Sequence, residues 1–133
     1  MANEAVPIEK WGKAVRFTVE DATGIEKGTI CKVADPRTAS ASSGNDYFAG
    51  IAATEKVASD GSTSLGMWRS GIWDLTATGA ITCGQRVALS GANLVKAAVA
   101  ADIDAGKDFG TALETAAHAE VINVLVDAGG PSA

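Results

Sequence analysis

Short runs of alternating or β-branched residues, each followed by a glycine-containing turn, recur along almost the whole chain. The clearest alternating run is Ala14–Glu20, in which Val15, Phe17 and Val19 fall on one face. The clearest continuous run is Glu120–Asp127 (EVINVLVD), whose β-branched residues predict a buried strand. Strands this short are stable only when they pair with several neighbours, so the sequence predicts a mainly β fold.

Other segments of the chain have the same strand-like character: Thr29–Val33, Tyr47–Ala53, Leu65–Leu75, Gly79–Leu89 and Leu94–Ala97. Between them, Ser59–Ser62 contains Asp-Gly, which supplies the positive φ angles of a tight turn. Gly71 falls inside Leu65–Leu75, so that stretch is expected to be a strand pair or one bent strand with a bulge at the glycine. Asp35–Asp46 is dense in Ser, Ala, Pro and Gly and is predicted to be a surface loop.

Two segments near the C-terminus are less distinct. Ala98–Lys107 fits either a loop or a helical turn, and Thr111–Ala119 has the Ala, Leu and Glu content of a helix. A loose internal repeat is also present: Phe48–Ala52 and Phe109–Leu113 each combine an aromatic residue, a glycine and small apolar residues before a turn and a strand. Duplication of a hairpin and chance both explain this similarity.

The length of the chain, 133 residues and 13.4 kDa, fits one domain. We expect an extended N-terminal arm (1–13), a single β domain (14–127) and a flexible C-terminal tail (128–133). The formal net charge is −5, and all of it falls in residues 38–133, because residues 1–37 carry six basic and six acidic side chains. An acidic chain without a basic stripe argues against nucleic-acid binding. We also expect no signal peptide and no membrane-spanning segment.

The inventory of reactive side chains argues against an enzyme. His118, the only histidine, has no Ser, Cys or Asp at a catalytic spacing. Cys31 and Cys83 are expected to be free, buried thiols, a disulfide between them being the alternative. The acidic stretch Asp102–Gly106 lacks the glycine and glutamate that a calcium loop needs. We therefore predict no catalytic residues, no metal site, no cofactor and no small-molecule substrate.

The three tryptophans are expected to have different roles. Trp68 and Trp73 lie in the best strand region and are expected to pack in the core. Trp11 lies in a polar arm that cannot bury it locally. It is either an anchor that docks onto another subunit or a cap that folds back onto its own barrel.

Three stretches of the chain resemble one known family. They are MANEAV with ATGIEKGTICKV, then FAGIAATEKVASDGSTSLGMWRSGIWDL, and finally FGTALETAAHAEVINVLVD. Their order and spacing are similar to those of the phage capsid cement, or head decoration, proteins. None of the motifs is catalytic. The long Ser-rich segment Asp35–Asp46 departs from the shorter connection expected in the family.

The resemblance implies a small single-domain β-barrel or β-tulip-like fold, with Thr111–Ala119 forming a strand and turn rather than a helix. It also implies a homotrimer that binds the major capsid protein on the outer surface of the virion and stabilises the expanded shell. An arm with Pro7, Lys10, Trp11 and Lys13 would then make the capsid contact. The alternatives are another virion component, such as a head–tail adaptor or tail protein, and a biotinyl- or lipoyl-type carrier module. The carrier needs a lysine in a hairpin turn, and the turns around Gly61 and Gly91 have none.

Overall fold

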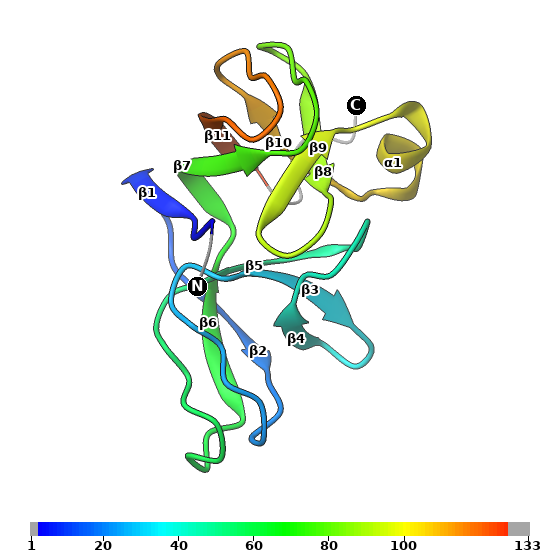
Figure 1. Ribbon diagram of the computed structural model, residues 1–133. Helices are drawn as coiled ribbons and strands as arrows, with labels where there is room; N and C mark the ends of the chain where they lie inside the picture. The colour runs from blue at the N-terminus through cyan, green and yellow to red at the C-terminus, as the bar shows by residue number, and fades with distance from the viewer. Residues whose placement is uncertain (1–2, 128–133) are drawn as a thin grey trace.

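The computed structural model describes residues 3–127 and is mainly β, as predicted (Figure 1). The strands of the first half are β1 (Val6–Glu9), β2 (Val15–Thr18), β3 (Ile30–Ala34), β4 (Thr38–Ala41), β5 (Phe48–Ala52) and β6 (Ser64–Trp68). Those of the second half are β7 (Ser70–Ala77), β8 (Arg86–Leu89), β9 (Leu94–Ala97), β10 (Asp108–Ala112) and β11 (Val121–Asp127), with one short helix, α1 (Ala100–Ala105). No helix among residues 3–127 is long and apolar enough to cross a membrane.

The strands form two five-stranded barrels, one below the other in Figure 1. The first barrel closes in the order β2-β4-β3-β5-β6. The second has the order β7-β11-β10-β8-β9 and closes through a parallel pairing of β9 with β7. Strand β1 adds to the outer edge of β7. Closure pairs both edges of each barrel and leaves β1 as the edge strand of the larger sheet.

The two barrels have the same connectivity, so the loose repeat in the sequence corresponds to a structural one. In each barrel, the first strand pairs in parallel with the third and antiparallel with the fifth. An isolated bridge recurs at the same place, Ile25 with Lys56 and Ile81 with Ala116. The pairings equate Gly50 with Gly110, so the two phenylalanines of the repeat are offset by one position.

The core explains why two small barrels form one domain. One buried cluster contains the interior of the second barrel together with Ile30, Phe48 and Ile51 from the first. Phe48 and Phe109 stack with their ring centroids 4.2 Å apart, which joins the barrels through two aromatic side chains. Trp73 is buried as expected, and Trp68 is half-buried against the same cluster.

Some of the expectations are wrong in detail. Asp35–Asp46 is not wholly a loop, because β4 lies within it and pairs with both β3 and β2. Its Ala and Ser side chains lack the apolar period of a strand, and only barrel closure makes this segment one. The strand is interrupted at Arg69, two residues before Gly71, which separates β6 from β7. These two strands belong to different barrels. Cys31 is free and buried, whereas Cys83 is free and exposed.

The doubtful segments near the C-terminus are resolved. Ala98–Lys107 contains helix α1, and Thr111–Ala119 is the end of β10 followed by a turn, as the family resemblance implied. The helix propensity of that turn is overridden because Leu113 and Ala116 donate backbone hydrogen bonds to neighbouring strand and loop carbonyls. The expected tail, 128–133, lies outside the described residues.

Candidate functional site

Strand β1 places the expected arm along the side of the second barrel. Val6, Pro7 and Glu9 pair antiparallel with residues of β7, and the register shifts between Pro7 and Glu9. All four residues of β1 are exposed, including the apolar side chains of Val6 and Ile8 at 51% and 49%. The N-terminal segment is therefore an apolar edge strand that is held by its backbone and leaves its side chains available.

A glycine in β7 makes room for this arm. Gly71 has a φ of +114°, and a Cβ atom there would lie 2.6 Å from the carbonyl oxygen of Glu9. The neighbouring Ser70 hydroxyl donates a 2.7 Å hydrogen bond to the carbonyl of Trp11. Together, the absent side chain of Gly71 and the hydroxyl of Ser70 set the path of residues 9–11. The position that the sequence predicts for a bulge is thus where the arm crosses the barrel.

The four residues expected to form the contact surface are all exposed and follow one another along this path: Pro7, Lys10, Trp11 and Lys13. The ammonium group of Lys10 lies 5.1 Å from the ring centroid of Trp68, a cation–π contact that positions the Lys10 side chain. The Trp11 side chain is 47% exposed, so its own barrel does not bury it. We refer to Val6–Lys13 as the arm surface.

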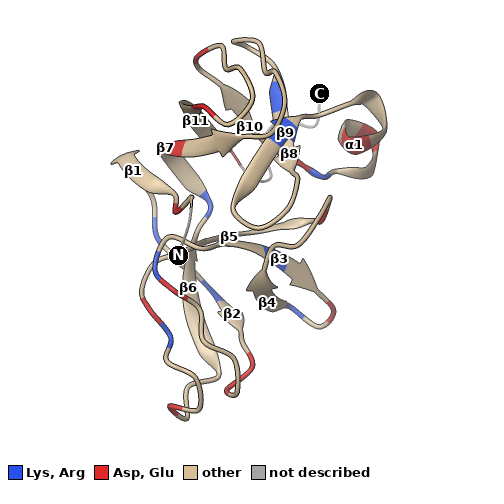
Figure 2. Ribbon diagram, viewed as in Figure 1, with Lys and Arg blue, Asp and Glu red and all other residues tan. Residues whose placement is uncertain are grey.

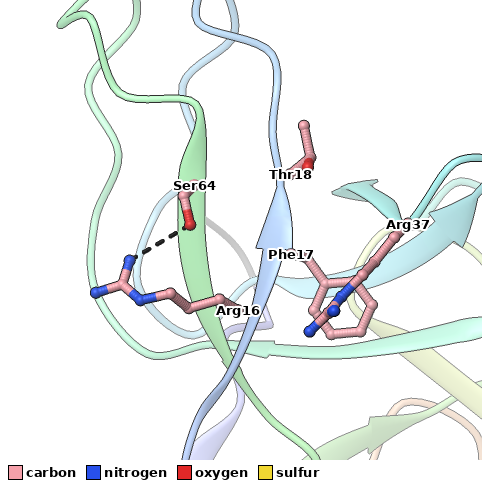
Figure 3. Close-up of a pocket in the computed structure, with 5 residues that line it drawn as sticks. All are labelled: Arg16, Phe17, Thr18, Arg37 and Ser64. Atoms are coloured by element: carbon pink, nitrogen blue, oxygen red, sulfur yellow. Dashed lines mark hydrogen bonds between the residues drawn. The ribbon is translucent and has the colours of Figure 1, made fainter.

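A second feature, which sequence reasoning missed, is a cationic hollow on the first barrel (Figure 3). It has a volume of about 240 Å³ and is lined by Arg16, Phe17, Thr18, Arg37 and Ser64. The Arg37 guanidinium lies 5.7 Å from the centroid of the Phe17 ring, and the Arg16 guanidinium donates a hydrogen bond to the Ser64 hydroxyl. Neither arginine forms an ion pair within residues 3–127.

The backbone fixes one side of this hollow. Arg37 has a φ of +45°, an uncommon conformation for a residue with a side chain, and its carbonyl accepts a hydrogen bond from the amide of Thr18. Strand alternation places Arg16 outside the barrel beside the buried Phe17. In the sequence, the alternation of Ala14–Glu20 already indicates that Arg16 lies on the exposed face of its strand. The pairing of β2 with β4 brings in Arg37, and no local pattern predicts that pairing.

A buried charge cluster around Lys56 holds two loops of the first barrel. Lys56 is buried, and its ammonium group donates to the backbone carbonyls of Asp21 and Val57 and to the carboxylate of Asp60 at 3.1 Å. The backbone amide of Ser62 and the Lys56 ammonium both bond the Asp60 carboxylate and lower its pKa. Acidic residues otherwise lie in loops at both ends of the molecule, in helix α1 and in β7 (Figure 2).

His118 lies in a turn, and the potential metal ligands of residues 3–127 form no cluster. The Nδ1 atom of His118 accepts a hydrogen bond from the backbone amide of Gly79, in an exposed turn. No group of three or more His, Cys, Asp or Glu residues within 3–127 is placed to hold a metal ion. The features that distinguish the surface are therefore the arm surface and the cationic hollow.

Comparison with known proteins gives one family. No curated protein sequence matches the chain. Among solved structures, the fold is similar to the N base of the head fiber protein gp8.5 of bacteriophage phi29, with a TM-score of 0.56 and 16% identity, over 85% of this chain and 93% of that one. The family model described as phage cement protein matches residues 10–128. This match covers both barrels, and the chain belongs to the phage cement protein family.

Proposed function

We propose that this protein is a capsid decoration protein that binds the outer surface of a phage capsid as a homotrimer and stabilises the expanded shell. The observation that carries the proposal is the family match across residues 10–128. The similarity in fold to a protein described as a head fiber base supports a place on the virion head. The major capsid protein is the proposed partner.

The surface chemistry supports a binding role rather than a reaction. A cement protein needs many modest contacts that symmetry multiplies, because each copy that binds restrains several shell subunits at once. Two closed barrels supply a rigid body for such contacts. The acidic character of residues 38–133 keeps copies soluble when they are crowded on one shell.

The arm surface is the proposed capsid contact. Exposed Val6, Ile8 and Trp11 provide apolar area along this segment, and Lys10 and Lys13 add positive charge that outweighs the one exposed carboxylate, Glu9. Tryptophan is the residue most enriched among energetically dominant contacts at protein interfaces. A side chain that is 47% exposed in the free protein still has area to bury against a partner.

The structure determines which variants test this proposal. Removing residues 1–13 would also remove Ala5, which is buried in the core and bonded to Gly28, and would uncover the edge of β7. Point variants are therefore better suited than a truncation. We expect W11A and the double variant K10A/K13A to remain folded and to weaken binding to undecorated capsids at least tenfold.

The matched control is V57A, because Val57 is 59% exposed on the loop between β5 and β6 and lies outside the arm surface. Binding is measured by co-sedimentation with capsids, and folding by circular dichroism. If W11A occupies capsids as fully as the wild-type protein does, the arm surface is not the capsid contact. Binding of the wild-type protein to tails rather than heads would favour a tail or adaptor component.

A further inference from the structure

A second hollow lies where the two barrels meet. It has a volume of about 240 Å³ and is lined by Val33, Tyr47, Phe48, Arg69, Gly106, Asp108 and Phe109. These residues come from β3, β5 and the residue before β5 in the first barrel, from β10 and the residue after α1 in the second, and from the single residue that connects β6 to β7. The Phe48–Phe109 stack forms an apolar wall.

Within residues 3–127, the guanidinium of Arg69 in this hollow lacks a partner at Nε. This atom is buried and donates no hydrogen bond there. No ion pair or cation–π contact of residues 3–127 involves this side chain. Loss of solvation lowers the pKa of Arg69, as expected for a cation without a counter-charge. A half-buried charge in this state is costly unless a partner compensates it.

The acidic residue nearest in the lining is already engaged. Asp108 accepts a 2.7 Å hydrogen bond from Nε of Arg86, which also contacts Asp127 at 3.5 Å. The ring of Tyr47, another lining residue, contacts the ammonium group of Lys107 at 5.3 Å from the ring centroid. The lining therefore contains one cation, Arg69, and one carboxylate that is neutralised by another arginine, which favours an anion.

The chemistry of the lining selects the type of anion. The Nε–H and one terminal N–H of a guanidinium form a planar pair of donors that matches the two oxygens of a carboxylate. The apolar walls of Val33, Phe48 and Phe109 suit the aliphatic carbon that bears such a group. A dianion such as phosphate fits less well, because Arg69 is the one cation among the lining residues and Asp108 adds a negative charge there.

We infer that the hollow between the barrels is a binding site for a carboxylate group, held by Nε–H and a terminal N–H of the Arg69 guanidinium and seated against Phe48 and Phe109. The group comes either from an Asp or Glu side chain of a bound polypeptide or from a small free carboxylate. The first source would give the protein a second contact on its partner and rests on the proposed function. The carboxylate site itself does not.

The test uses the full chain in solution. The Arg69 Nε–H resonance is followed by ¹H–¹⁵N spectroscopy during titration with sodium propionate, with N-acetyl-glutamate amide, or with sodium chloride at equal ionic strength. We expect a saturable shift with the carboxylates and none with chloride. Saturable binding, read from neighbouring backbone amides, should weaken at least tenfold in R69Q, and R69K should restore it only in part because an ammonium lacks the planar fork. R16Q, which removes an exposed arginine of the cationic hollow, should bind as wild type.

The results of these titrations distinguish the two sources of the carboxylate, and they are independent of the test of capsid binding. Tighter binding of the glutamate amide than of propionate assigns the site to a polypeptide side chain, and the reverse order assigns it to a free carboxylate. A linear response, or the same response with chloride, overturns the inference, and this result does not depend on whether R69Q folds. Capsid binding by wild type and R69Q is measured separately. Failure of the wild-type protein to bind capsids contradicts the proposed function and leaves the carboxylate titration as an independent result.

Discussion

Replacing Gly71 by alanine tests how the arm is attached. The Cβ atom of alanine would lie 2.6 Å from the carbonyl of Glu9 and 3.0 Å from Nε1 of Trp73, at a φ of +114°. Backbone strain alone costs about 1–2 kcal/mol. Relief of the clash requires β1 to move away, which loses roughly two backbone hydrogen bonds worth about 1 kcal/mol each. We therefore expect G71A to lower the free energy of unfolding by about 3–4 kcal/mol.

The matched control is G79A. Gly79 has a φ of +74° with nothing within 4 Å of the added Cβ, so this variant carries the strain without the clash. Urea denaturation of both variants gives the difference, expected to be about 2 kcal/mol. Hydrogen exchange should show loss of protection in β1 and along the edge of β7 only in G71A. Equal destabilisation of the two variants, with β1 still protected, would refute the argument that Gly71 accommodates the arm.

Three further predictions concern single side chains. Iodoacetamide should modify Cys83 in the native protein but reach Cys31 only after unfolding, because burial shields that thiol and raises its pKa to about 12; mass spectrometry reads the sites. K56A should lower the free energy of unfolding by about 1–3 kcal/mol, measured in urea, because two part-buried carbonyls and a carboxylate lose their donor. The side-chain amide of Asn45 and the backbone amide of Val99 lower the pKa of Asp102, so this carboxylate stabilises the fold above its ordinary pKa of 3.8 and loses that effect as pH falls through the lower folded value. The destabilisation by N45A should therefore be larger at pH 7 than at about pH 2, by urea denaturation; equal destabilisation at both would contradict this.

Local patterns predicted most strands of this fold. The alternation of Ala14–Glu20 gives β2, and the β-branched run Glu120–Asp127 gives β11. The existence of two barrels was not predicted, because closure depends on parallel pairings between distant segments, β2 with β4 and β7 with β9. The internal repeat was the available signal. The repeat was hard to recognise because its alignment placed Phe48 on Phe109, whereas these two residues are offset by one position in the two barrels. In the structure the two rings stack against each other.

Of the candidate sites, one was indicated by the sequence and the others became visible only in the folded structure. The arm residues are adjacent in sequence, so composition alone singled them out, and the structure adds how Gly71 and Ser70 hold them. Arg37 and Arg69 lie in segments without any motif. They became candidates only when folding placed Arg37 beside Phe17 and left Arg69 without a partner between the barrels.

Capsid decoration, the proposed function, can be observed on the particles themselves. The purified protein is mixed with undecorated capsids of its phage, and the structure of the particles is determined by cryo-electron microscopy. We expect trimeric density on the outer surface where capsid subunits meet, with the arm surface, Val6–Lys13, directed toward the shell. Capsids without added density, or density confined to the tail, would contradict it.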